Sequence, residues 1–215
     1  MAFDSAVYDR EENNMNRAAI LLDDYYYGMP RKDILAKLKI PLPPDHEQRI
    51  LRDPGEISFL GYNWEELFYF DNDEALRQII LIRATRDGET FRSIQEELIN
   101  SGWTPVSVET DEATFDIFGL ANRRDHEITN RELKEFESQA LEKNDSVTVY
   151  FFPAAFADKV LTDSKIKFWA NAIDKAPENF CLLSFAADAN NIKLSFTAPL
   201  LSRKAALKYG EKIKR

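Results

Sequence analysis

Apolar side chains recur along this chain at two alternating spacings, first every third or fourth position and then every second. The first spacing is typical of a helix with one buried face, and the second of a strand in a half-buried sheet. Clusters of Asp, Asn, Gly and Pro separate the segments, as turns do. Because a helix followed by a hairpin recurs along the chain, the sequence predicts an α+β fold. We expect a mostly antiparallel sheet built of repeated helix-hairpin units, with helices packed on one face.

The first part of the chain, residues 1–86, predicts a helix-helix-hairpin module. Helical spacing of apolar residues defines its helices, and aromatic and β-branched runs define its strands. In order, the segments are a helix near 9–27, a short helix between Pro30 and Pro41, a Pro-rich loop at 41–56, and a hairpin of 57–70 with 76–85 about the turn Asp71–Glu74.

Residues 87–215 predict a second α+β module that shares a continuous core with the first. The same two spacings define its elements, and a Thr129/Glu132 capping box indicates the start of one helix. In order, they are a helix from Phe91 that closes at Gly102, strands at 106–108 and 115–117, the helix opened by the capping box, a strand at 147–151, a helix over 160–173, a hairpin of 181–185 with 192–196, and a terminal helix.

The chain carries a formal charge of −9 and a pI near 4.9. Nucleic acids and anionic membrane surfaces repel such a protein, so we expect neither as a partner. The segment from Arg203 to Arg215 is basic, which fits either the negative end of a helix dipole or an acidic partner. No stretch approaches the roughly 20 apolar residues that span a bilayer, so we expect no transmembrane segment.

The compartment is left open by the sequence. Cys181 is the lone cysteine and lies among apolar residues, which predicts a small core residue on a strand and no intramolecular disulfide. Residues 1–5 lack the basic and apolar regions of an export signal, so the chain as written is expected to be cytoplasmic. A signal peptide removed from upstream of Met1 would instead place the protein in the periplasm or envelope.

Three segments carry a resemblance to a known family: Gly28–Pro41, Trp64–Phe70 and Ala75–Ile79. Over about residues 20–85 the chain resembles the SmpA/OmlA family, small envelope lipoproteins of outer-membrane protein assembly that are similar in fold to β-lactamase-inhibitor-protein modules. The shared pattern is a Gly-Met pair, a short helix, a variable loop, an aromatic strand and a second strand. Lys39 stands where the family prefers glycine, and no lipidated cysteine lies near the N-terminus. The resemblance implies a bacterial, non-enzymatic module that binds protein partners.

Motifs of known chemistry are missing from the sequence, since it contains no G-x-G-x-x-G, Walker or G-x-S-x-G segment. His46 and His126 stand between carboxylates but lack a His or Cys partner at metal-ligand spacing, so we interpret both as exposed loop residues. Paired carboxylates such as Asp23–Asp24 and Glu65–Glu66 are interpreted as solvated faces of an acidic protein. We therefore expect no catalytic, cofactor-binding or metal-binding residues.

Tyr25, Tyr26 and Tyr27 are the candidate interaction residues, together with Trp103. On a helix, three consecutive tyrosines cover most of the circumference, so one ring would lie outside the buried stripe, where tyrosine favours protein interfaces. The alternative is a partly buried ring with its hydroxyl in water, and Trp103 fits either core or rim. Two functions remain open. One is a non-enzymatic protein-protein interaction module with an unknown partner; the other is a small-ligand binder or enzyme with an unrecognised carboxylate/His site.

Overall fold

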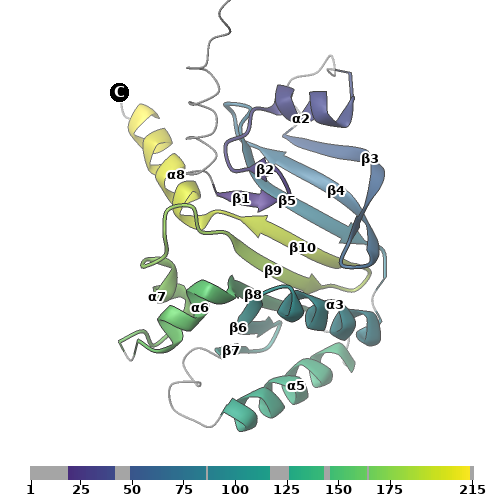
Figure 1. The fold of residues 1–215 in the computed structure, drawn as a ribbon, viewed down its shortest axis with the longest axis vertical. Helices are drawn as coiled ribbons and strands as arrows, with labels where there is room; N and C mark the ends of the chain where they lie inside the picture. The colour runs from purple at the N-terminus through teal and green to yellow at the C-terminus, as the bar shows by residue number, and fades with distance from the viewer. Residues whose placement is uncertain are drawn as a thin grey trace, which may run out of the picture.

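The computed structural model of the protein describes residues 19–41, 49–85, 87–116, 126–142, 146–163 and 165–213. These residues form one eight-stranded sheet, in which all pairs are antiparallel, and a separate two-stranded hairpin (Figure 1). The spatial order of the large sheet is β3-β4-β5-β10-β9-β8-β6-β7. Its strands are β3 (Ile50–Phe59), β4 (Tyr62–Phe70), β5 (Leu76–Arg83), β6 (Trp103–Thr110), β7 (Thr114–Asp116), β8 (Val147–Pro153), β9 (Leu182–Ala187) and β10 (Ile192–Thr197).

Six helices accompany the sheet within the described residues. They are α2 (Arg31–Leu38), α3 (Gly88–Asn100), α5 (His126–Glu142), α6 (Ala154–Leu161), α7 (Trp169–Ile173) and α8 (Pro199–Ile213). The α+β class and the antiparallel sheet are therefore confirmed. The repeated helix-hairpin unit is not, because α2 precedes three consecutive strands whereas α5 precedes a single strand.

Helix α3 shows how directly the sequence determines a local element. Asp87 lies just before the helix, and its Oδ1 accepts a hydrogen bond from the Thr90 backbone N–H at 2.6 Å. After the helix, Gly102 takes a φ of +89°, a conformation that glycine adopts without strain. Between them Phe91, Ile94 and Leu98 fall on one face and are fully buried, as their spacing predicts.

The main hydrophobic core lies between α3 and one face of the sheet. On β4, β5 and β10 every second residue points into it, among them Phe68, Ile79 and Phe196. The Phe91 ring of α3 stacks on the Phe185 ring of β9 with 4.3 Å between centroids. Strand β5 of the first predicted module pairs with β10 of the second, so residues from both contribute to this one cluster.

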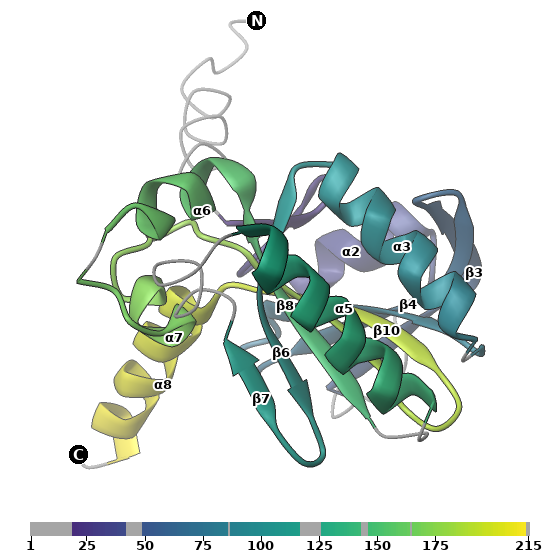
Figure 2. The ribbon, with the colours of Figure 1, turned by 90° about the horizontal axis from the view of Figure 1, so that it is seen from below.

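A second, smaller cluster involves the other face of the same sheet. Tyr150 and Phe152 of β8 alternate with the core residues Val149 and Phe151 and pack instead with α6 and α7. The Trp169 ring of α7 stacks on Tyr150 at 4.5 Å. The expectation that the helices pack on one face is therefore wrong: Figure 2 shows α3 and α5 on one side of the sheet, whereas α7 packs through Tyr150 on the other.

The predicted helix near 9–27 is wrong over its second half, and residues 9–18 lie outside the described part of the chain. Residues 20–26 form a hairpin of β1 (Ile20–Leu22) and β2 (Tyr25–Tyr26). The turn between them places Asp23 at a φ of +48°, which a helix does not contain. We call Ile20–Tyr26 the tyrosine hairpin. The helix prediction failed because a three-residue strand followed by a sharp turn can bring apolar residues to one side at the same spacing as a helix does.

The loop predicted at 41–56 is shorter than expected, because β3 already begins at Ile50. Its Asp53-Pro54-Gly55 segment lies within the strand as a bulge, since pairing with β4 slips between Arg52 and Glu56. Pro54 is tolerated there because β3 is an edge strand, where a residue without an N–H leaves no ladder bond unmade. The Pro and Gly therefore indicated a bulge, and not a loop.

Two helix boundaries also differ from the prediction. The helix expected over 160–173 is two helices, because α6 ends at Leu161 and α7 begins at Trp169. The Thr162 hydroxyl donates back to the Lys159 carbonyl oxygen at 3.0 Å, which ends the hydrogen-bonded turn with a side chain. Helix α5 begins at His126, three residues before the predicted cap Thr129, so the capping box is wrong.

Replacing Phe91 with Ala should reveal how far this core stabilises the fold. Loss of the stacked ring leaves a cavity, so we expect the free energy of unfolding to fall by roughly 3–5 kcal/mol. Ile99→Ala on the same helix is the matched control, because that side chain is 46% exposed and its loss should cost less than about 1 kcal/mol. Urea unfolding of both variants measures the difference, and equal losses would contradict the assigned helix face.

Candidate functional site

The structure places the three predicted tyrosines on the tyrosine hairpin and just after it, rather than on a helix. Tyr25 is half-buried with its ring edge-on to Phe68 at 4.9 Å, and Lys37 of α2 lies 5.3 Å above that ring. Tyr26 is also half-buried. Tyr27 is buried, and Arg77 lies 4.6 Å above its ring. The hairpin therefore presents edges of Tyr25 and Tyr26 to solvent, with Tyr27 inside.

Trp103 lies in the eight-stranded sheet, whereas the tyrosines lie on or just after the separate hairpin. Trp103 begins β6, is half-buried, and contacts the Phe196 ring at 6.5 Å in an edge-on arrangement. His46 falls outside the described residues, as does the side chain of His126. The predicted carboxylate/His site is therefore not brought together in the part of the chain that the structure describes.

Other predicted features also lie within the described residues. The predicted turn at Asp71–Glu74 is confirmed, because Asp71 Oδ1 accepts the backbone N–H groups of Asp73 and Ala75. The basic residues Arg203 and Lys204 reach Asp174 and Glu178 at 2.6 Å. Over the described ranges, His, Cys, Asp and Glu form no group of three placed to hold a metal ion. Similarly, the helices so described include none with the length and apolarity needed to cross a membrane.

One end of the sheet exposes apolar side chains on the face opposite the main core. Leu67 and Tyr69 of β4, with Ile80 and Ile82 of β5, alternate with buried core residues and are partly exposed. Neither of the two hydrophobic clusters that the described residues form includes them. We call these four residues the apolar patch. Figure 2 shows α3 and α5 on the opposite side of the sheet.

The strand register extends this patch into a straight row across five strands. Leu67 pairs with Ile80, Ile80 with Ser195, Ser195 with Ser184, and Ser184 with Tyr150. All five side chains are partly exposed. At the usual strand spacing the row is roughly 19 Å long. We call this row, together with the apolar patch, the open face.

The open face changes in chemistry along its length. Small hydroxyl residues occupy its middle, where Gln78 Nε2 donates to Ser195 Oγ at 2.5 Å. At the far end Tyr150 is stacked on Trp169, and its hydroxyl donates to Glu109 Oε2 at 3.0 Å. Burial and this contact with Glu109 raise the pKa of Tyr150 to about 12, so the phenol stays neutral at physiological pH. The result is a shallow polar middle between an apolar end and an aromatic end.

A buried carboxyl group lies on the core side of the same sheet. Glu66 occupies the inward phase of β4, between Trp64 and Phe68, and is 1% exposed. Its Oε1 has no hydrogen-bond partner in the part of the chain that the structure describes. A buried oxygen without a partner is unusual in proteins and costs free energy in the charged state especially.

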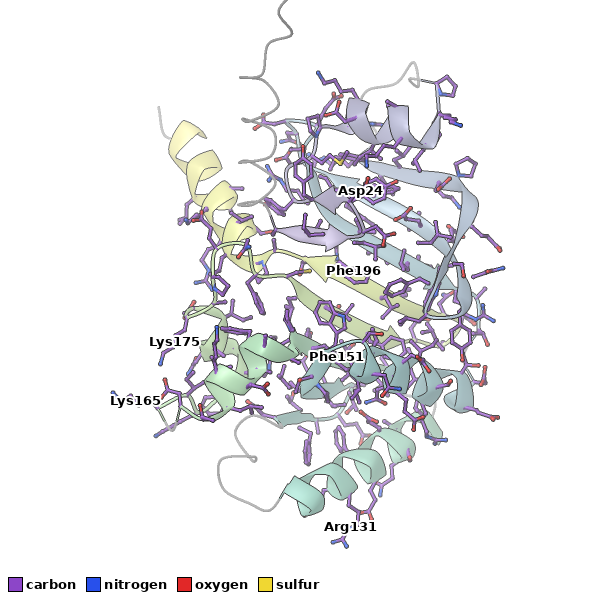
Figure 3. All side chains as sticks on the ribbon, viewed as in Figure 1. Asp24, Arg131, Phe151, Lys165, Lys175 and Phe196 are labelled. Atoms are coloured by element: carbon purple, nitrogen blue, oxygen red, sulfur yellow. The ribbon has the colours of Figure 1, made fainter. Side chains whose placement is uncertain are left out.

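Burial, together with the nearby charges of Asp53 and Asp23, raises the pKa of Glu66 from 4.5 to about 8. Burial likewise raises the pKa of Tyr25 to about 12, and Glu66 makes the largest contribution among the neighbouring acidic groups. Asp24 of the tyrosine hairpin forms an ion pair with Lys37 of α2; Asp24 is labelled in Figure 3. At neutral pH the Glu66 carboxyl is thus protonated and the Tyr25 phenol neutral, and both lie near Asp23 and Asp53.

The interpretation of Glu65–Glu66 as a solvated pair is half wrong. Glu65 faces the open side and contacts Arg52 at 2.5 Å, whereas Glu66 is buried. The signal was present in the sequence, because Glu66 shares the every-second phase of Trp64, Phe68 and Phe70. The open face was also missed, since whether a strand face is covered depends on elements distant in sequence.

Comparison with models of known protein families, with curated proteins and with solved structures gives no match for this chain. The arrangement of its own residues is therefore the basis for the functional argument.

Replacing Glu66 with Gln should stabilise the protein at neutral and alkaline pH. The folded state binds the proton of Glu66 more tightly than the unfolded state, so its stability is greatest below pH 4.5 and is lost as pH rises toward 8. Removing the charge should raise the free energy of unfolding by roughly 2–3 kcal/mol at pH 7 and flatten this pH dependence.

The adjacent Glu65→Gln variant is the control for that measurement. Because Glu65 is solvent-facing, its replacement should leave the pH dependence of the free energy of unfolding unchanged. Urea unfolding from about pH 5 to 9 compares the two. If Glu66→Gln has the same pH dependence of the free energy of unfolding as the native protein, Glu66 ionises freely in the folded protein.

Proposed function

We propose that this protein is a non-enzymatic module that binds another protein through its open face. The observation that carries the proposal is the row from Leu67 to Tyr150, which is partly exposed on a rigid sheet while the opposite face forms the core. Exposed apolar side chains that gather on one surface mark interaction sites more often than scattered ones do.

The chemistry of the row suits docking of a protein surface. The apolar patch and the Tyr150–Trp169 stack provide contact area at the two ends, and aromatic side chains lose little conformational entropy on binding. Ser184 and Ser195 in the middle are small, so a partner backbone or side chain can approach the sheet closely. Their hydroxyl groups also offer both a donor and acceptors for its hydrogen bonds.

A basic protein is the partner that we propose. The chain has a formal charge of −9, which attracts a positively charged partner over distance and raises the rate of encounter. Glu65 and Glu109 flank the row at its two ends and would favour cations at the rim of the interface.

The likeness to envelope assembly lipoproteins remains part of the proposal. In its support, Lys39 adopts the left-handed conformation with a φ of +55° at the position where the family prefers glycine. The short helix α2, which ends just before Lys39, also precedes the aromatic strand β4 as in the shared pattern, with β3 occupying part of the stretch that the pattern gives as a variable loop. A bacterial envelope location is proposed on this likeness.

Site-specific photocrosslinking tests the docking surface. A photoreactive amino acid at Ser184, in the middle of the row, should trap one defined protein in cells of the source organism. The same probe at Glu97, exposed on α3, should not. Ile80→Lys removes an apolar contact and adds a repulsive charge, so we expect it to reduce the Ser184 product at least about tenfold.

Leu207→Lys is the matched control, because that leucine is 65% exposed on α8, away from the row. It should leave the product unchanged, and circular dichroism should show that both variants fold. A Tyr25→Ala, Tyr26→Ala variant distinguishes the predicted tyrosine site from the open face. If that variant abolishes the product while Ile80→Lys does not, or if Glu97 traps the same protein equally, the open face is not the docking surface.

A further inference from the structure

The tyrosine hairpin is attached to the molecule differently from every strand beneath it. It forms its own two-stranded sheet, separate from the eight-stranded one. Side-chain packing holds it in place: Leu21 and Leu22 are buried in the main core, and Tyr25 lies on Phe68. Its backbone joins the sheet after β2, where Gly28 N–H donates to the Leu76 carbonyl oxygen at 2.7 Å. An element held in this way is able to separate without breaking the large sheet.

Glu66 is the buried group whose charge opposes this packing. Glu66 shares the inward phase of β4 with Phe68, and the Tyr25 ring of the hairpin lies 4.9 Å from the Phe68 ring. The charge of Asp23 in the hairpin turn acts on the Glu66 carboxyl, whose Oε1 lacks a hydrogen-bond partner among the described residues. When Glu66 loses its proton, an unpaired negative charge is buried in an apolar surrounding, which is among the costlier states a protein can hold.

The charged groups around Glu66 reinforce this effect. Asp53 approaches from β3 and Asp23 from the hairpin turn, and both repel an ionised Glu66. Lys37 of α2 is paired with Asp24 of the hairpin. From β5 the register partner of Glu66 is Leu81, which is buried and has no charge to offer.

We propose that Glu66 is a proton-controlled latch for the tyrosine hairpin. With Glu66 protonated, the hairpin packs closed over β4; when Glu66 ionises, the hairpin separates from the sheet and water reaches the carboxylate. Opening transfers one proton from Glu66 to solvent. A pKa near 8 places this change just above neutral pH. The device acts on the core side of the sheet and does not depend on partner binding at the open face.

Cys181 is a native reporter of hairpin opening. It is the lone cysteine and is 8% exposed, and its Sγ lies 4.0 Å from the Leu21 carbonyl oxygen of β1. Separation of the hairpin therefore uncovers the thiol. The experiment measures the rate at which a maleimide labels Cys181 in the full chain and in Glu66→Gln, at each pH from about 6 to 9.

The ratio of the two rates removes the intrinsic pH dependence of the thiol, which is the same in both proteins. We expect the ratio of the native rate to the Glu66→Gln rate to rise by up to about tenfold per pH unit, and to level off above pH 8. A ratio that stays constant over this range would overturn the proposal.

Global unfolding would also uncover Cys181, so a second reporter distinguishes the two. In Cys181→Ser, Ala157→Cys the thiol lies in α6, fully buried in the second cluster. Its labelling should show no comparable rise; a parallel rise would mean that the whole molecule opens, which contradicts a local latch. Asp23→Asn retains Glu66 but removes one charge that raises the pKa of Glu66 in the folded protein. Its labelling ratio should therefore level off at a lower pH, and at a smaller value, than that of the native chain.

Discussion

The pairing of β5 with β10 is the contact on which the rest of the structure depends. Six residue pairs join Gln78–Arg83 to Ile192–Thr197, segments more than 100 residues apart in the chain. Their inward side chains, such as Ile79 opposite Phe196, lie at the centre of the main core. Without this pairing, the strands that precede α3 and those that follow it would form two small sheets, each with another edge exposed to solvent. With it, one wide sheet supports both the hydrophobic core and the open face.

Local elements could be predicted from the sequence where one spacing repeated without interruption. Strands β4, β5 and β8 to β10, together with α3, lie where alternation or helical spacing placed them. The prediction failed where a segment was too short for its spacing to be distinctive, as in the tyrosine hairpin. It also failed at β3, where Pro54 and Gly55 look the same in a bulge as in a loop. Strand order was beyond reach, because pairing between distant segments leaves no local pattern.

For the candidate sites too, local features could be predicted from the sequence and contacts between distant segments could not. That Glu66 faces inward could be deduced from its phase on β4, but its missing partner and the approach of Asp23 depend on how the hairpin packs. The open face required the strand register, since Leu67, Ser195 and Tyr150 come from three separate parts of the sequence. Single residues were thus identifiable, whereas their assembly was not. Glu66 and Glu65 show how adjacent identical side chains acquire opposite environments from the pleat of one strand.

The bulge at Asp53-Pro54-Gly55 also affects how copies of the molecule meet. An open sheet has two edges, and each is a template on which a strand from another chain can add. On β3 the missing N–H of Pro54 and the slipped register interrupt the regular row of donors and acceptors that such a strand would need. The opposite edge, β7, has three residues and offers little length for pairing. Edge-to-edge addition of another chain is thereby hindered at both edges of the sheet that the structure describes.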